Sequence, residues 1–389
     1  MKKHTVVKTI AEINEKIKSG NVVVVTAEEM VKIVRSEGEV GAAKKVDVVT
    51  TGTFGPMCSS GAFFNFGHTK PRIRASEVLV NNVPAYGGIA AVDFYLGATE
   101  PTREDPLNKV YPGHFSYGGG HVLHDLVSGE KVDLVATSYG TDCYPNREIK
   151  KKMSLKDFPY AVLLNPRNAY QNYNVAVNRG DKTLYTYMGI LRPQMANANY
   201  CCAGELSPLL NDPFFQTIGL GTRIFLGGGV GYVIWHGTQH NPKTNRGIKG
   251  VPTAPSGTLS VIGDLKGMNP RFLVGVSFMG YGTSLAIGLG IPIPILNEEI
   301  AYHASIADEE IEAPIVDYSY DYPQGTGKIL GSTNYAALKT GTITFEGKEI
   351  QTTPLSSWVR AREVAEALKG WIKKGTFTLT EPQALLPSK

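Results

Sequence analysis

The sequence contains little cysteine: only Cys58, Cys143, Cys201 and Cys202 occur in 389 residues. No two of them have the C-x-x-C spacing that is typical of iron–sulfur clusters and structural zinc sites. Because the chain is long enough to bury a large core, it needs no disulfides to fold. The sequence therefore argues against a disulfide scaffold, and we expect this chain to bind no cofactor of its own.

Nucleotide-binding patterns are absent as well. Glycine-rich segments such as GYGGGHVLH and GYGTSLAIGLG contain no G-x-G-x-x-G, and G-x-x-x-x-G-K-[ST] occurs nowhere in the chain. The net charge of +4 comes from 39 basic and 35 acidic side chains that are spread along the sequence. We therefore expect neither a nucleotide cofactor nor a nucleic-acid partner.

Long apolar segments are scarce. Residues 272–296 carry no charge over a length that could span a bilayer, but their glycines and two prolines predict a buried strand and a glycine-rich turn. The N-terminal MKKHTVVKTIAEINEKIKSG predicts an amphipathic helix with Ile10, Ile13 and Ile17 on one face, not a signal peptide. We therefore expect no membrane partner and a cytoplasmic, reducing location in which the cysteines are thiols.

The first third of the chain alternates between strand and helix patterns. Val22–Val25 predicts a buried strand, Thr26 and Glu29 form a capping box that begins a helix, and residues 46–52 predict the next strand. Later strands, in YAVLLN, TRIFLGGGVGYVIW and TLSVIGDL, follow one another closely and predict antiparallel hairpins. A further hairpin is predicted around Glu346–Lys348.

These patterns predict an α/β chain with α+β features. We expect a mixed parallel and antiparallel sheet with helices packed on it and with glycine-rich loops. No repeat or linker is evident, so residues 1–389 are predicted to form a single domain, with two lobes that divide near residues 150–200.

Cys58 and Cys143 occupy similar sequence settings. Each follows an apolar, β-rich run and a glycine, in VDVVTTGTFGPMCSSG and in VDLVATSYGTDCYPNRE. Loops at the carboxyl ends of strands in α/β sheets converge on a crevice, so the two thiols could share a site, although each could also be an ordinary small side chain. Cys201 and Cys202 are interpreted as packing residues, because neighbours in a strand point to opposite faces.

A polar loop supplies further candidates. His240, in WHGTQHNPKTNRG, follows a buried strand and a glycine turn, and Gln239 and Arg246 are close to it in the sequence. Such a loop could bind substrate or could be a simple turn. A metal held by Cys58, Cys143 and a histidine also stays open at this point.

Five segments together resemble one family over nearly the whole chain: TTGTFGPMCSSGAFFNFGH, NNVPAYGGIAAVD, VATSYGTDCYPNRE, GELSPLLNDPFFQTIGLGTRIFLGGGVGYVIWHGTQH and PLSSWVRAREVAEALKGWI. They look like the homocysteine biosynthesis family, the L-aspartate semialdehyde sulfurtransferases of anaerobic archaea and bacteria. The resemblance implies that aspartate 4-semialdehyde, a sulfide equivalent and two electrons give homocysteine, with sulfide or a persulfide as the sulfur donor. It also implies a separate ferredoxin-like electron donor.

The family relies on two cysteines, which match Cys58 and Cys143. Members often carry paired CBS domains after this region, and the sequence ends at Lys389 without them, so regulation through such domains is not expected. We hypothesise that one cysteine bonds to the substrate sulfur as a persulfide or mixed disulfide. The other cysteine would then resolve that bond, leaving a Cys58–Cys143 disulfide that the external reductant resets.

Further roles follow from this hypothesis. Ser59 and Ser60 could donate hydrogen bonds to a sulfur anion, and Arg147 could favour the thiolate of Cys143. Arg223 or Arg246 could bind the substrate carboxylate. Two other functions stay open, a persulfide carrier without its own small-molecule substrate and a thiol-ligated metal hydrolase. The chain could also form a homo-oligomer.

Overall fold

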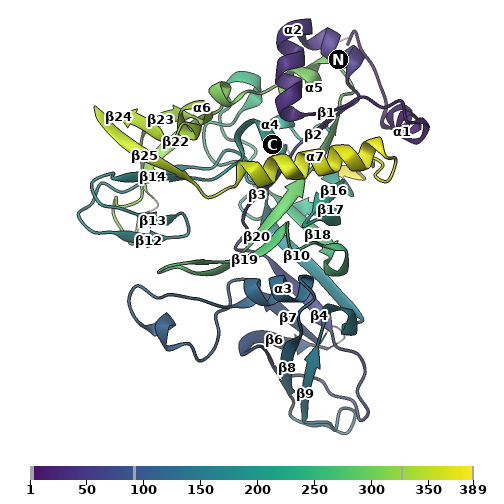
Figure 1. Cartoon of the computed structure of the whole chain (residues 1–389), viewed down its shortest axis with the longest axis vertical. Coiled ribbons are helices and arrows are strands. Elements are labelled where there is room, and N and C mark those ends of the chain that lie inside the picture. The colour runs from purple at the N-terminus through teal and green to yellow at the C-terminus, as the bar shows by residue number, and fades with distance from the viewer. Residues whose placement is uncertain (1–3, 91–92, 326, 388–389) are drawn as a thin grey trace.

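The structure is a computed structural model that describes residues 4–90, 93–325 and 327–387. Within these ranges helices and strands both build the fold, and the strands form mixed parallel and antiparallel sheets (Figure 1). The predicted α/β class with a mixed sheet is therefore confirmed. The α-helices are α1 (Ile10–Ser19), α2 (Ala27–Lys45), α3 (Gly119–Val127), α4 (Pro208–Asn211), α5 (Glu298–His303), α6 (Tyr335–Lys339) and α7 (Trp358–Lys373).

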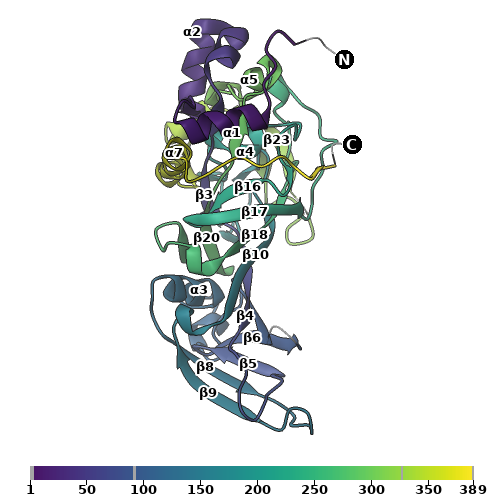
Figure 2. The ribbon, with the colours of Figure 1, turned by 90° about the vertical axis from the view of Figure 1, so that its right-hand side faces the viewer.

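The largest sheet runs from the middle of the molecule to its lower end in Figures 1 and 2. Its strands pair antiparallel, as expected for closely spaced hairpins. In spatial order they are β19 (Leu273–Phe278), β20 (Gly282–Gly290), β16 (Arg223–Leu226), β17 (Gly229–His236), β18 (Leu259–Asp264), β10 (Tyr160–Asn168), β4 (Gly61–Asn65), β7 (Asp93–Gly97), β6 (Val83–Ile89), β5 (Glu77–Val80), β8 (Val132–Thr137) and β9 (Glu148–Met153), with β3 (Thr53–Pro56) paired to β20. Residues on both sides of 150–200 thus contribute to one sheet, and the division into two lobes there stays a prediction.

A six-stranded sheet lies beside the upper part of the molecule in Figure 1. In order its strands are β23 (Lys328–Asn334), β22 (Glu312–Asp317), β11 (Val175–Val177), β14 (Asn197–Tyr200), β25 (Lys348–Pro354) and β24 (Thr342–Phe345). β11 pairs parallel with β22, and β14 pairs parallel with β25. The hairpin predicted around Glu346–Lys348 is confirmed, since β24 pairs with β25 and Glu346 and Gly347 turn the chain with φ values of 49° and 75°. Two small pairs complete the strands, β12 (Leu184–Thr186) with β13 (Gly189–Leu191) and β15 (Gly219–Leu220) with β26 (Ala384–Leu385).

The N-terminal region follows the predicted strand, helix and strand pattern. Helix α1 buries its three isoleucines, as the amphipathic pattern predicted. β1 (Val24–Thr26) and β2 (Val48–Thr50) pair in parallel, and α2 connects them. The capping box of Thr26 and Glu29 is present at the start of α2. β21 (Pro292–Pro294) completes a three-stranded sheet by pairing antiparallel with β2.

The uncharged segment 272–296 folds as three strands, β19, β20 and β21. Every residue of β20 is buried, so the predicted buried strand is confirmed. Across the part of the chain that the structure describes, no helix has the length and apolar character needed to cross a membrane.

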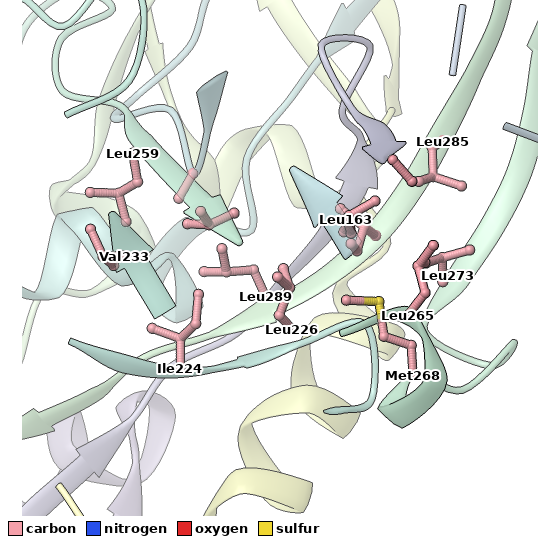
Figure 3. Close-up of a cluster of buried hydrophobic side chains, with 14 of the residues drawn as sticks. Leu163, Ile224, Leu226, Val233, Leu259, Leu265, Met268, Leu273, Leu285 and Leu289 are labelled. Atoms are coloured by element: carbon pink, nitrogen blue, oxygen red, sulfur yellow. The ribbon is translucent and has the colours of Figure 1, made fainter. Parts of the chain in front are cut away.

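The main hydrophobic core lies where β10, β16, β17, β18, β19 and β20 meet. Figure 3 shows its aliphatic side chains, among them Leu163, Leu226 and Leu285, which are all fully buried. Each such side chain contributes about 1.5–3 kcal/mol through its burial. This core gives β20 and its neighbour β3 a rigid setting.

Helix α7 packs against β20 and β3. The close approach depends on Gly52, because a Cβ there would collide with the carbonyl of Ala361 in α7. The chain that leads into the Cys58 loop is therefore held on one side by the sheet and on the other by α7.

Candidate functional site

A cavity of about 100 Å³ lies between the large sheet and the six-stranded sheet. Its wall includes the side chains of Cys58, Cys201 and Cys202. Arg167 is the charged residue of this wall, and no Asp or Glu lines the cavity within the described ranges. The cavity therefore combines thiols with a single positive charge, which suits a small anionic molecule.

Cys58 lies in a turn directly after β3. The N–H of Ser60 donates to the carbonyl of Met57 at 2.9 Å and closes this turn. Pro56, the last residue of β3, pairs with Ala286 of β20, so the large sheet carries the turn. The Ser284 hydroxyl donates to Cys58 Sγ at 3.2 Å and orients the thiol. The half-buried thiol thus reaches the cavity from a fixed position.

Arg167 lies within an irregularity of β10, where the pairing with β18 shifts between Asn165 and Asn168. The Arg167 N–H donates to the side-chain oxygen of Asn165 at 2.8 Å, which fixes the local backbone. Arg167 Nη1 donates to Oε1 of Gln239 at 2.6 Å, and the guanidinium lies 5.9 Å from the ring centroid of Tyr170. These contacts hold the guanidinium at the cavity while leaving other N–H groups for a ligand.

Tyrosines form a second part of the wall. Tyr170, Tyr173 and Tyr187 line the cavity, and the hydroxyls of Tyr173 and Tyr187 lie 3.1 Å apart. The Tyr187 hydroxyl also lies 3.0 Å from that of Tyr318. Burial raises the pKa of Tyr173 and of Tyr318, so both hydroxyls stay protonated. Burial and the neighbouring Cys58 thiol raise the pKa of Tyr281 to about 12. The tyrosines are therefore neutral hydrogen-bonding groups beside the thiols.

Cys201 and Cys202 reach the cavity directly after β14, which was not expected for packing residues. Both do pack in hydrophobic clusters. The alternation of a strand does not apply to them, because β14 ends at Tyr200 and Cys202 has a φ of +117°. Burial raises the pKa of Cys201 to about 11 and raises that of Cys202. The interpretation of this pair as packing alone was therefore incomplete.

Cys143 lies elsewhere, at the exposed tip of the β8–β9 hairpin. Asn146 in this hairpin loop donates to the carbonyl of Arg72, which lies beyond the last residue of β4, whereas Cys58 precedes the first residue of β4. The five residues of β4 alone span about 16 Å at roughly 3.3 Å per residue. A disulfide needs its two Cα atoms within about 7 Å of each other. Figures 1 and 2 likewise place β8 and β9 far from β3. This conformation does not bring Cys58 and Cys143 together.

Cys58 and Cys143 lie apart because the strands that precede them pair antiparallel. The argument for converging loops holds for parallel strands, whose carboxyl ends share one edge. β3 pairs antiparallel with β20, and β8 pairs antiparallel with β5 and β9. Arg147 belongs to the same distant loop, where its side chain lies against Gly140.

The two predicted serines differ in position. Ser59 lines the cavity, and its contact with a ligand stays a prediction. Ser60 is buried, and its hydroxyl accepts a hydrogen bond from Asn165 Nδ2 at 2.7 Å. Gln239 reaches the site indirectly, through the hydrogen bond that it accepts from Arg167.

The remaining predicted residues lie outside this cavity. Arg223 stacks 4.5 Å from the ring centroid of Phe377 and donates to Thr378 at 3.3 Å. His240 Nδ1 accepts from the Thr258 N–H at 3.1 Å, and its Nε2 lies 2.8 Å from the Pro387 carbonyl.

Arg246 lines a different hollow, with Phe214 and Pro242. Its guanidinium donates to the Gly250 carbonyl at 2.9 Å, and burial lowers its pKa. None of these three side chains lines the wall around Cys58 within the described residues, and their observed contacts stabilise loops.

Over residues 4–90, 93–325 and 327–387, no cluster of three or more His, Cys, Asp or Glu side chains is arranged to hold a metal ion.

Comparison with known proteins agrees with the sequence resemblance. The profile of a family described as homocysteine biosynthesis enzyme, sulfur-incorporation, matches residues 22–379. The chain belongs to this family. It is 52% identical over 389 aligned residues to a Methanocaldococcus jannaschii protein named L-aspartate semialdehyde sulfurtransferase, with 97% of this chain and 72% of the relative covered.

Two further relatives extend the comparison. A Methanosarcina acetivorans protein of the same name is 49% identical over 378 residues, with 96% of this chain and 71% of the relative covered. An uncharacterized protein of Methanothermobacter thermautotrophicus is 29% identical over 319 residues, covering 79% of this chain and 67% of that protein. No solved structure is significantly similar to the chain.

Sequence reasoning missed Arg167, Tyr170 and Tyr187 as members of the site. A weak signal exists for the first two, since the apolar run YAVLLN ends in the polar PRNAYQN, just as the runs before the predicted candidates end in polar loops. Tyr187 lies in the turn of the separate β12–β13 hairpin, and nothing in its spacing connects it to Cys58. Tertiary packing alone brings it to the cavity.

Proposed function

We propose that this protein converts L-aspartate 4-semialdehyde to L-homocysteine by reductive sulfur transfer. Two relatives that share about half of its residues carry the name of the semialdehyde sulfurtransferase. The observation that ties this activity to residues of this chain is that Cys58 and Arg167 line the same small cavity.

Arg167 is the proposed anchor for the substrate carboxylate. A guanidinium binds a carboxylate through two parallel hydrogen bonds, and the wall offers no competing acidic side chain within the described ranges. Gln239 already holds Nη1, so it orients the guanidinium. The carboxylate would then bind at one end of the cavity, with the aldehyde directed toward the thiols.

The proposed reaction consists of an addition, a loss of water and a reduction. Hydrogen sulfide adds to the aldehyde to give a thiohemiacetal, which loses one water to form a thioaldehyde. The thioaldehyde takes up two electrons and two protons to become the thiol of homocysteine. Cys58 is the proposed thiol that bonds to the substrate sulfur, because it lies at the cavity in the turn directly after β3, where Ser284 orients its Sγ.

Sulfur and electrons must be supplied from outside. We propose as the sulfur source either sulfide or a persulfide donor, whose outer sulfur needs two further electrons to be released as sulfide, and a ferredoxin-like protein as the electron donor. Cys143 is exposed, and that suits thiol exchange with a partner. The disulfide between Cys58 and Cys143 stays a prediction, and it requires a large movement of the β8–β9 hairpin or a Cys143 from a second chain.

An anaerobic assay tests this function. The purified protein is mixed with L-aspartate 4-semialdehyde, sodium sulfide and titanium(III) citrate, and homocysteine is measured by mass spectrometry. We expect repeated turnover by the wild-type protein and none by Cys58→Ser.

A wild-type protein that makes no homocysteine under these conditions would contradict the proposal. If, given a persulfide donor in place of sulfide and no reductant, it instead gains a stable persulfide on Cys58 and passes that sulfur to an acceptor protein, the persulfide carrier is the better description. The Arg147→Ala variant is a matched control, because Arg147 lies in the distant hairpin loop.

A further inference from the structure

Cys201 lines the same cavity as Cys58, but it is not one of the two cysteines on which the family relies. Cys58 approaches it from the large sheet, and Cys201 approaches it from the end of β14 in the six-stranded sheet. The two residues are 143 positions apart in the sequence (201 − 58), so no local motif connects them. Their shared place in the wall is a product of how the two sheets pack.

A short segment after β25 holds the two thiol-bearing segments of the chain next to each other. The Leu355 N–H donates to the carbonyl of Tyr200, the residue before Cys201, at 2.8 Å. Two residues later, the Ser357 N–H donates to the carbonyl of Phe54 in β3 at 2.9 Å. This segment of three residues therefore connects the end of β14 to β3, the strand that leads into the Cys58 turn.

Ser356, between these two anchors, contacts both sides. Its hydroxyl lies 3.5 Å from Cys201 Sγ and accepts the Cys202 N–H at 3.1 Å. On the other side it lies against Gly55, where a Cβ would come within 2.8 Å of the Ser356 hydroxyl. Gly55 is three residues before Cys58. The absence of a side chain at Gly55 thus lets the Cys201 region approach the Cys58 turn.

Cys202 is placed differently from Cys201. Its Sγ lies 2.7 Å from the Ser207 hydroxyl, and its side chain packs in the core of the six-stranded sheet. The Ser207 hydroxyl also accepts the Ala203 N–H at 3.1 Å, so the two residues form a local turn. Cys202 lines the same cavity and is adjacent in sequence, but Ser207 holds its Sγ, so Cys202→Ser is the comparison that shows which thiol of the pair resolves the bond.

From this arrangement we infer that Cys201 is a catalytic residue, the thiol that resolves the sulfur bond between Cys58 and the substrate. The inference rests on the proposed function, and it names the in-chain partner of Cys58. Cys143, at the exposed tip of the β8–β9 hairpin, would then serve exchange at the surface and not resolution within the cavity.

The steps balance with two thiols. The Cys58 thiolate attacks the sulfur of the bound thioaldehyde, the carbon takes a proton, and a mixed disulfide between Cys58 and homocysteine forms. Cys201 then attacks Cys58 Sγ, which breaks the bond to the substrate sulfur and releases homocysteine, with the proton of Cys201 going to the leaving thiolate. The two cysteines are oxidised to a disulfide by two electrons, and an external two-electron donor reduces it again.

Burial keeps Cys201 protonated in the resting cavity. It is the main cause that raises the pKa of Cys201 to about 11, and the charges of Cys202 and, less strongly, Cys58 add to it. The proton of Cys201 is therefore available for the leaving thiolate.

A single-turnover experiment without added thiol or reductant tests the inference. The reduced protein is mixed anaerobically with L-aspartate 4-semialdehyde and sulfide, then acid-quenched and digested with trypsin. Cleavage after Lys and Arg places Cys58, Cys143 and Cys201 in different peptides, 46–72, 132–147 and 183–223. The Cys202→Ser variant removes the ambiguity of the third peptide.

We expect the wild-type and Cys202→Ser proteins to release up to one equivalent of homocysteine and to yield a Cys58–Cys201 cross-linked peptide. Cys201→Ser should release none and should retain homocysteine as a mass adduct on Cys58. Homocysteine release by Cys201→Ser at the wild-type level, or a cross-link between Cys58 and Cys143 in the wild-type protein, overturns the inference.

A second readout keeps this test separate from the proposed function. Oxidation of the wild-type protein by diamide, without substrate, should form the Cys58–Cys201 cross-link in preference to any link to Cys143. A wild-type protein that forms this link but never makes homocysteine contradicts the proposed function alone. A protein that makes homocysteine but forms no such link, with substrate or with diamide, contradicts the role of Cys201 alone.

Discussion

The loops that carry Cys58 and Cys143 look alike in sequence but end in different places. The first is fixed between β20 and helix α7 and brings its thiol to a cavity. The second is the exposed tip of the β8–β9 hairpin, where its backbone contacts residue 72 instead of the cavity. Similar local composition therefore specified a similar turn, whereas the strand pairing decided what each thiol faces.

The difference separates two tasks that a sulfur-transferring enzyme needs. An enclosed thiol can hold a substrate intermediate away from water and from other thiols. An exposed thiol can exchange sulfur or electrons with a partner. Cys58 has the first environment and Cys143 has the second.

The largest effect should come from the enclosed thiol. Cys58→Ser is expected to lower homocysteine formation more than about 10³-fold, because it removes the group that bonds to the substrate sulfur. With sulfide and a chemical reductant, Cys143→Ser should stay within about threefold of the wild-type rate, because partner exchange is bypassed. Initial rates by mass spectrometry check both. Equal losses in the two variants would remove the proposed division of tasks.

The pH dependence of alkylation distinguishes the thiols without any turnover. The pKa of Cys201 is about 11 in the folded protein, so its thiolate fraction, and its labelling by iodoacetamide, should rise about 100-fold from pH 7 to pH 9. Exposed Cys143 is open to the reagent at every pH. Peptide mapping after short labelling measures each site. Labelling of Cys201 at pH 7 as fast as that of Cys143 would show that the cavity does not protect it.

Arg167 should affect substrate binding more than folding. Arg167→Ala is expected to lower kcat/KM for the semialdehyde about 10- to 100-fold, because it removes charged hydrogen bonds to the carboxylate. Arg167→Lys should recover part of this loss by restoring the charge without the planar fork. Arg147→Ala, in the distant loop, is the control and should leave kcat/KM unchanged. An Arg167→Ala enzyme with a normal KM and kcat would exclude the proposed anchor.

The two neighbouring serines provide the smallest and most local test. Ser60→Ala should lower the free energy of unfolding by about 1–3 kcal/mol, because it leaves the buried Asn165 amide without its acceptor. Ser59→Ala should change stability by less than about 0.5 kcal/mol and act on KM instead, since Ser59 lines the cavity. Urea unfolding and steady-state kinetics measure the two effects. The reverse pattern would mean that Ser60, not Ser59, faces the ligand.

Much of the local structure was predictable from the sequence. The isoleucine spacing predicted α1, the Thr26 and Glu29 pair predicted the start of α2, and Glu346–Lys348 predicted a hairpin. These features depend on contacts within a few residues, so the information for them is local. The family resemblance likewise pointed to Cys58, which the structure places in the cavity.

The site as a whole was not predictable in this way. Arg167 lies in β10, Tyr187 in the turn of the β12–β13 hairpin and Cys201 directly after β14, and they meet only through tertiary packing. Periodicity and spacing describe one segment at a time, and they do not report which segments pair or whether the pairing is parallel. Arg223 and Arg246 illustrate the same limit, because their residue type suited a carboxylate but their contacts place them elsewhere.

The sequence by itself determined the class of the fold, its local turns and caps, and the family to which the chain belongs. Tertiary structure alone decided which side chains share the cavity. The physical reason is that secondary structure follows from backbone preferences and nearby side chains, whereas a site is assembled by burial of apolar faces from distant segments. That burial placed Cys201 beside the Cys58 cavity and left Cys143 at the surface.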